Sequence, residues 1–121
     1  MTLGVLLATG AAGAVGTLLR FSVDGAAMRA FRRPFPLGTM VVNLSAALLL
    51  GLLVGLAASG RTQTIVGTGL LGGYSTFSTW MLETVRLAED RRPGWAVANV
   101  VVSVAGGLLG VVLGRAIGRG F

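Results

Sequence analysis

The feature that most constrains this chain is its division into four long stretches without a charged residue, at positions 2–19, 35–60, 62–82 and 93–114. A helix needs roughly 20 apolar residues to cross a bilayer. Because the hydrocarbon core cannot satisfy open backbone groups, such stretches cross it as helices. The sequence therefore predicts one all-α membrane domain over residues 1–121, with four transmembrane helices at about 2–21, 36–60, 62–85 and 93–115.

Composition supports this class and excludes several others. Hydrophobic residues make up 54% of the 121 positions and charged residues 12%, against about 25% charged residues in soluble domains. A soluble chain of this length could not bury so much apolar surface. Cysteine, histidine and lysine are absent, which excludes thiolate or imidazole metal sites, Schiff-base chemistry and a Ser-His-Asp triad. We expect no enzyme activity.

The basic residues lie between the apolar stretches. The net charge is +6, and all ten basic residues are arginine. This placement favours contact with the headgroups of a lipid bilayer over binding of nucleic acid. With four crossings, residues 20–34 and 86–92 share one side and hold seven arginines against three on the other, so we expect that side to be cytoplasmic. Segment 22–34 is expected to be a polar interfacial connection, with Pro34 and Pro36 starting the second helix.

Small residues recur at helical spacing in two of the stretches. Gly51 and Gly55 form one GxxxG step, and Gly106, Gly110 and Gly114 form two more. Glycine at this spacing lets helix backbones approach closely in a membrane. We interpret these glycines as helix-packing residues.

The third stretch combines glycines, hydroxyls and aromatic side chains. Gly72 and Gly73 fall near its middle, hence near the bilayer midplane, and the hydroxyl- and aromatic-rich residues 74–80 follow. Adjacent glycines weaken a helix, and hydroxyls can bond the freed carbonyls. We predict that the third helix is broken here, which leaves carbonyls able to bind a cation and a half-helix N-terminus able to favour an anion. A tightly packed, unbroken helix is the alternative.

Two polar residues stand out in the other apolar stretches. Asn43 lies within the second and Ser103 within the fourth. An amide in lipid needs a partner, so Asn43 either faces a water-filled path or makes an interhelical hydrogen bond with no further role. Ser103 either lines the same path or bonds a carbonyl of its own helix.

Four segments follow one another with a recognisable spacing. Residues 13–21 (GAVGTLLRF) form a glycine-rich helix that ends in an Arg-aromatic pair. Residues 36–43 (PLGTMVVN) match the pattern PLGTxxxN, residues 72–80 (GGYSTFSTW) approach GGxTTFSTF, and residues 94–96 (GWA) lead into the last stretch. Their order and spacing, with the layout of four uncharged stretches, extend over nearly the whole chain and resemble the Fluc fluoride channel family, also called CrcB.

The resemblance implies an antiparallel, dual-topology homodimer of four-helix subunits with two narrow fluoride pores. It implies a structural sodium ion, not transported, that the main-chain carbonyls of Gly72 and Ser75 from both copies hold at the dimer centre. The fluoride pathway that it implies comprises Asn43, Phe77, Ser78, Thr79, Trp80 and Ser103. The implied function is passive export of cytoplasmic fluoride through the inner (plasma) membrane of a prokaryotic cell.

Two charged residues are candidates for the pore mouth or vestibule. Arg20, at the end of the first stretch, could raise the anion concentration there, and a headgroup anchor is the alternative. Glu83, near the end of the third helix, either lines a vestibule or caps the helix.

The chain departs from the family motif at two positions. Ser75 stands where the family has threonine, which should matter little because the implied ligand is a main-chain oxygen. Trp80 stands where the family has a second pore phenylalanine, and an indole is larger and adds an N–H donor. Tyr74 occupies a variable position and is assigned no role. The arginine bias exceeds that of an ideal dual-topology chain, so pairing with an oppositely oriented paralogue is the alternative to a homodimer.

The residue types suit a small, strongly hydrated anion. Amide and hydroxyl donors and the positive edge of an aromatic ring can replace its water without an ionised group in the pore. A small dual-topology proton-coupled exporter is one alternative, but it needs an acidic or basic residue at depth, and the four stretches hold none. A structural helper subunit of a membrane complex is another, which would explain the glycines but not Asn43 or the hydroxyl–aromatic cluster.

Overall fold

The computed structural model describes residues 2–31 and 35–121, and the regular structure in this part of the chain is helical. The elements in chain order are α1 (Leu3–Phe31), α2 (Leu37–Gly55), α3 (Gly60–Thr62), the π-helix η1 (Gln63–Leu71), α4 (Gly72–Tyr74), α5 (Ser78–Glu89) and α6 (Pro93–Arg119). The prediction of an all-α chain is confirmed.

Three of these helices, α1, α2 and α6, are long and apolar enough to cross a membrane. Many of their large apolar side chains are exposed, including Leu18 at 68% and Val112 at 63%. Such extensive apolar exposure is expected of surfaces that face lipid rather than water. These helices therefore point to a membrane protein.

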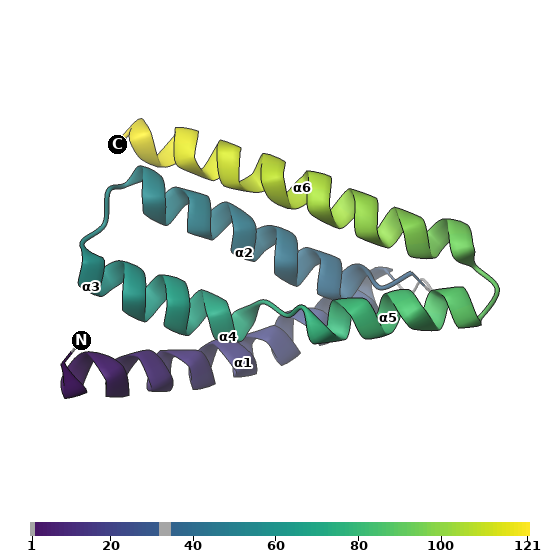
Figure 1. Ribbon diagram of the computed structural model, residues 1–121, viewed down its shortest axis with the longest axis horizontal. Coiled ribbons are helices and arrows are strands. Elements are labelled where there is room, and N and C mark those ends of the chain that lie inside the picture. Colours follow the sequence, from purple (N-terminus) through teal and green to yellow (C-terminus); the bar gives the residue numbers. More distant parts are fainter. Residues whose placement is uncertain (1, 32–34) are drawn as a thin grey trace.

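The helices form an elongated bundle in which the chain passes back and forth along one direction (Figure 1). Helices α2 and α6 run side by side in the same direction, and α3, η1, α4 and α5 follow one another in a neighbouring row that runs the opposite way (Figure 1). Helix α1 packs against η1, α4 and α2. Both chain ends lie at the same end of the bundle (Figure 1).

Glycines bring α2 and α6 into backbone contact. A Cβ added to Gly51 would overlap with the backbone of Val111, and one added to Gly114 would overlap with the backbone of Leu48. Gly55 meets the Arg115 backbone in the same way. The interpretation of these glycines as helix-packing residues is confirmed.

Helix α1 is longer than the sequence predicted. Residues 22–31 were expected to belong to a polar connection, but they continue the helix to Phe31. One side of this extension packs against the start of α2, where the Sδ of Met28 accepts the Gly38 N–H at 3.4 Å. The Asp24 carboxylate also lies where a Cβ on Gly38 would be. Packing against α2 keeps this polar segment helical, and a count of charges could not reveal that.

Other helix ends differ less from the prediction. Pro36 lies directly before α2, whereas Pro34 lies outside the described residues. Helix α2 ends at Gly55, earlier than predicted, because the chain turns at Ala57, which has a positive φ of 54°. Helix α6 continues to Arg119, beyond its predicted end.

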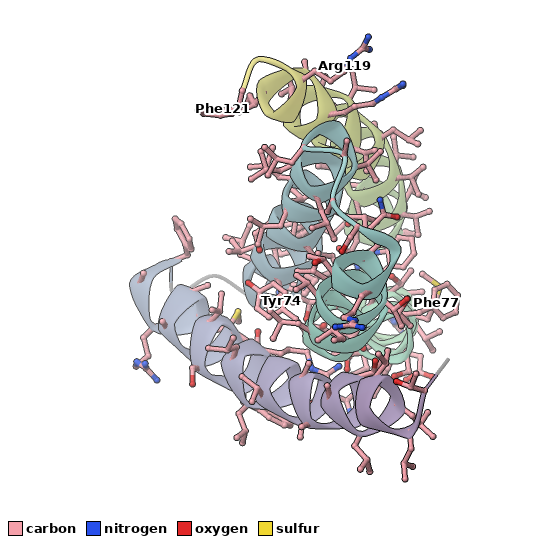
Figure 2. The ribbon with its side chains drawn as sticks, turned by 90° about the vertical axis from the view of Figure 1, so that its left-hand side faces the viewer. Tyr74, Phe77, Arg119 and Phe121 are labelled. Carbon is pink, nitrogen blue, oxygen red and sulfur yellow. The ribbon has the colours of Figure 1, made fainter. Side chains whose placement is uncertain are left out.

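A small buried cluster lies where α2 meets α4. It consists of Val42, Ala46 and Tyr74, with Val23 of α1 packed against it. The Tyr74 hydroxyl is 2.8 Å from the Ser45 hydroxyl. Figure 2 shows Tyr74 turned towards the interior of the bundle, so the residue to which the sequence assigned no role is part of the core.

Candidate functional site

The helical course stops between α4 and α5. Ser75 has an extended backbone, with φ −78° and ψ 165°, and α5 begins only at Ser78. The sequence predicted an interruption at Gly72 and Gly73, but both of these glycines are helical. The non-helical residues are the three that follow Tyr74.

Gly73 does not break the helix but lets it pack closely against α1. A Cβ on Gly73 would overlap with the backbone of Gly13. The Thr17 hydroxyl donates to the Gly13 carbonyl at 3.0 Å and is 3.3 Å from the Gly73 carbonyl oxygen. A Cβ on Gly16 would overlap with the Leu70 carbonyl. Close backbone packing therefore explains Gly73, while the helix ends for another reason.

Asn43 of α2 holds the non-helical segment with two hydrogen bonds. Its Nδ2 donates to the Thr76 carbonyl at 2.9 Å, and its Oδ1 accepts the Thr76 N–H at 2.9 Å. Asn43 therefore joins α2 to the non-helical segment by hydrogen bonds, and a hydrogen bond to another element was one of its two predicted roles. A side-chain amide carries two N–H donors, so one of them is left for another acceptor.

Two backbone N–H groups of this region bond side chains instead of the carbonyls that they would bond in a continuous helix. The Thr76 N–H, which would bond the Gly72 carbonyl, goes to Asn43. The Thr79 N–H, which would bond the Ser75 carbonyl, goes to the Thr76 hydroxyl at 3.2 Å. The carbonyls of Gly72 and Ser75 are thus left without their helical donors. Main-chain carbonyl oxygens are suitable ligands for a hard cation, so these two atoms fit the sodium site that the resemblance implies.

Two grooves flank Asn43 and Trp80. The first, of about 410 Å³, is lined by Gly72, Ser75 and Phe77 as well. The second, of about 310 Å³, is lined by Ser103 of α6 as well. No acidic or basic side chain of the described residues lines either groove.

A smaller cavity of about 90 Å³ lies on another side of the interruption. It is lined by Arg20, Phe21, Asp24, Thr39, Val42, Thr76 and Thr79. Thr76 also lines the first groove, so the non-helical segment separates the groove from the cavity. The Thr39 hydroxyl bonds the carboxylate of Glu83. Thr39 is thus linked to both charged residues predicted at a pore mouth, because it lines the cavity with Arg20 and bonds Glu83.

The two aromatic residues of the motif differ in their environment. Phe77 is 71% exposed and points away from the bundle (Figure 2). Trp80 is half-buried, and its ring meets that of Phe77 edge to face, with 5.7 Å between the centroids. The Trp80 Nε1–H donates to the main-chain carbonyl of Asn99 in α6 at 3.3 Å. The indole donor that the sequence predicted therefore already has an acceptor.

The remaining predicted pathway residues are hydroxyls. The Ser103 Oγ is buried and has no hydrogen-bond partner among the described residues. Thr79 lines the small cavity. Ser78 is exposed at the start of α5, and its Oγ is 3.5 Å from the Thr76 Oγ1. The structure thus brings Ser103 to one groove and Thr79 to the cavity, while Ser78 lines neither.

Sequence analysis missed two residues that organise this region. Thr76 takes part in both bonds from Asn43, and its hydroxyl accepts the Thr79 N–H. In the sequence nothing distinguishes it from the hydroxyl residues on either side of it. Asn99 is 1% exposed and bonds Thr84 through its side chain. An amide inside an apolar stretch was a signal as clear as that of Asn43.

Comparison with known proteins gives a consistent result. The family model described as CrcB-like protein, Camphor Resistance (CrcB), matches residues 7–115. A protein of Mycolicibacterium paratuberculosis named fluoride-specific ion channel FluC 2 is 53% identical over 114 residues, which cover 94% of this chain and 93% of the relative. A FluC 2 of Mycobacterium tuberculosis is 47% identical and covers 95% and 91%. A FluC 1 of Frankia casuarinae is 42% identical and covers 90% and 92%.

The family model covers most of α1 and α6, all of α2, and the interrupted segment between α4 and α5. The relatives match over nearly their full length, and their names are those of ion channels and not of enzymes. The residues whose bonds hold the interrupted segment, Asn43, Thr76 and Thr79, lie inside the matched range. The chain therefore belongs to the CrcB family, a family of non-enzymatic membrane transport proteins.

Proposed function

We propose that this chain is a passive fluoride-selective channel that exports cytoplasmic fluoride across a bacterial inner membrane. The observation that carries the proposal is the match to relatives named fluoride-specific ion channels over 94% of the chain. The geometry around Asn43 agrees with it, because the first groove and the small cavity share Thr76 of the interrupted segment, and the two grooves share Asn43 and Trp80.

The proposed path is lined by donors that carry no net charge. One N–H of Asn43, the hydroxyls of Ser103 and Thr79, and the positive ring edge of Phe77 can each face an anion. Ser78 is exposed at the start of α5, and its hydroxyl would join the path from outside these spaces. Arg20 lies in the small cavity with Thr79, where its charge would attract fluoride to the mouth. Neutral donors bind a desolvated anion without holding it as firmly as an arginine would, and that suits conduction.

The run from α3 to α5 would form a fourth crossing, interrupted at Ser75–Phe77. Both chain ends lie at the same end of the bundle (Figure 1), as an even number of crossings requires. The interruption would lie within the bilayer, where non-helical backbone is tolerated only if protein or a polar cavity surrounds it. The bonds from Asn43 and the adjoining grooves meet this condition.

A second copy in antiparallel orientation would cover the first groove. Gly72 and Phe77 are exposed there, and a dimer would remove both from lipid. A paralogue of opposite orientation is the alternative partner, and the names FluC 1 and FluC 2 among the relatives are compatible with paired paralogues.

Gly72 and Ser75 would hold a structural sodium ion in this dimer. The support is that both of their carbonyls have lost their helical donors, and two copies would offer four such oxygens. A bound sodium ion would supply a fixed positive charge between the copies. The chain itself contributes the bonds from Asn43 and Thr76 that keep these oxygens unpaired.

The two alternatives receive less support. A proton-coupled exporter needs a group that titrates deep in the path. Among the described residues, no acidic or basic side chain lines either groove, and Asp24 and Arg20 line only the small cavity at the proposed mouth. A helper subunit would need the glycine packing of α2 and α6 but neither the bonds of Asn43 nor the grooves beside it.

Flux from liposomes tests the proposal. Purified protein is reconstituted, and efflux is followed with fluoride and chloride electrodes, with and without a proton gradient. We expect fast fluoride efflux, little chloride efflux and no requirement for the gradient. Equal efflux of both anions would refute selectivity, gradient-dependent efflux would support the exporter, and no efflux from folded protein would support the helper subunit.

A further inference from the structure

Three hydrogen bonds close a ring between α5 and α6. The Trp80 indole N–H donates to the Asn99 carbonyl at 3.3 Å, and the Asn99 Nδ2 donates to the Thr84 hydroxyl oxygen at 2.9 Å. The Thr84 hydroxyl in turn donates to the Trp80 carbonyl at 2.8 Å. The ring therefore restrains both the backbone and the side chain of Trp80.

Asn99 is the most deeply buried member of this ring. It is 1% exposed, and a buried amide without a partner would be costly in an apolar surrounding. It lines neither groove nor the small cavity. Any influence of Asn99 on the grooves therefore has to act through Trp80.

Trp80 is the aromatic residue that both grooves share. Together with Asn43 and Ala47 it lines each of them, and its ring packs edge to face on Phe77. Because the indole N–H is directed to the Asn99 carbonyl of α6, the ring offers its carbon atoms to the grooves. The larger side chain thus changes the width of the grooves but does not add a donor to them.

We propose that Asn99 is a positioning residue that, with Thr84, fixes the Trp80 ring between the two grooves with its N–H held out of the ion path. The ring then acts as an apolar wall that sets the width available to an anion, and Asn99 and Thr84 become determinants of selectivity for fluoride over larger anions. This proposal rests on the proposed fluoride channel function.

The first measurement does not depend on transport. In a Trp95→Phe background Trp80 is the only tryptophan. The Trp95 ring packs on Phe35 and Arg92 and makes none of the three hydrogen bonds. We expect Asn99→Leu and Thr84→Val to increase acrylamide quenching of Trp80 fluorescence, since the indole would lose its fixed position. Thr84→Ser keeps the hydroxyl and is the matched control, with quenching as in the background. Unchanged quenching in Thr84→Val would overturn the positioning role even if Asn99→Leu failed to fold.

The second measurement is the ratio of fluoride to chloride efflux from liposomes. Losing one hydrogen bond should lower this ratio about fivefold in Asn99→Leu and Thr84→Val, and not in Thr84→Ser. Trp80→Phe removes the indole, so adding Asn99→Leu to it should change the ratio little relative to Trp80→Phe alone.

The outcomes separate the two proposals. An effect of Asn99→Leu on the ratio that persists in the Trp80→Phe variant would overturn the inference. Altered quenching with an unaltered ratio would overturn the selectivity role. If the background protein itself passes no fluoride, the channel function fails, while the quenching result still decides whether Asn99 positions Trp80.

Discussion

Two parts of this protein hold helices together by different means. The α2–α6 pair is held by glycines that let two backbones touch along regular helices. The segment between α4 and α5 is held by side chains that bond the backbone in place of its helical partners. In the first part an added methyl group would push the two helices apart, so substitutions there should lower stability. In the second part the loss of a polar atom would release the segment, so substitutions there should change transport.

The largest effect on transport is expected for Asn43→Asp. The carboxylate cannot donate to the Thr76 carbonyl, and it would put a negative charge beside both grooves. Fluoride efflux from liposomes should fall about 100-fold or more, because an unpaired charge there costs several kcal/mol. Asn43→Ser, which keeps a small neutral donor, is the comparison variant. Unchanged efflux in Asn43→Asp would exclude Asn43 from the path.

Gly51→Ala tests the glycine-packed pair. Its Cβ would overlap with the Val111 backbone, so we expect a loss of about 1–3 kcal/mol in stability from overpacking. The measurement is the thermal unfolding midpoint in detergent. Gly10→Ala is the matched control, since nothing lies within 4 Å of a Cβ there, and its midpoint should be unchanged or slightly raised. If folded Gly51→Ala showed a changed ratio of fluoride to chloride efflux, the α2–α6 packing would affect transport as well as stability, contrary to this prediction.

Thr76→Val tests the other end of the segment. It removes the hydroxyl that accepts the Thr79 N–H at the start of α5, a loss comparable to that of a helix cap at about 1 kcal/mol. We expect reduced fluoride efflux, while Thr76→Ser should retain it. Equal efflux in the two variants would show that the hydroxyl is not needed to keep the segment in place.

The smallest effect is expected for Tyr74→Phe. It removes the hydrogen bond to the Ser45 hydroxyl but leaves the ring in the core with Val42 and Ala46. Stability should fall by about 1 kcal/mol, and fluoride efflux per folded protein should be unchanged. A Tyr74→Phe/Ser45→Ala double variant should be no less stable than Ser45→Ala, and additive losses would mean that the two hydroxyls act separately.

Much of the fold could be predicted because it follows from local patterns. Uncharged stretches of sufficient length predicted the helices, and GxxxG spacing predicted close helix packing, which the structure places between α2 and α6. The extension of α1 to Phe31 was missed because Met28 and Asp24 are kept helical by contacts with α2, which lies apart from them in the chain. Charge patterns carry no information on such contacts.

The candidate site was predicted less completely, for a related reason. Composition located the interruption within a few residues, but it gave the wrong cause, because Gly73 serves packing on Gly13. The actual cause is a pair of bonds from Asn43, which no spacing rule connects to Thr76. The acceptor of the Trp80 N–H likewise comes from α6, so the sequence suggested a free donor where the fold has already used it.

Because the two chain ends lie together, the direction in which each chain inserts into the membrane can be measured from either end. Because both ends lie at one end of the bundle (Figure 1), an epitope tag at either terminus must label the same face of the membrane in any given molecule. Protease cleavage of the two tags on sealed vesicles should then proceed to equal fractions. A fraction near one half would mean that chains insert both ways round, and a fraction near zero or one would mean a single insertion direction.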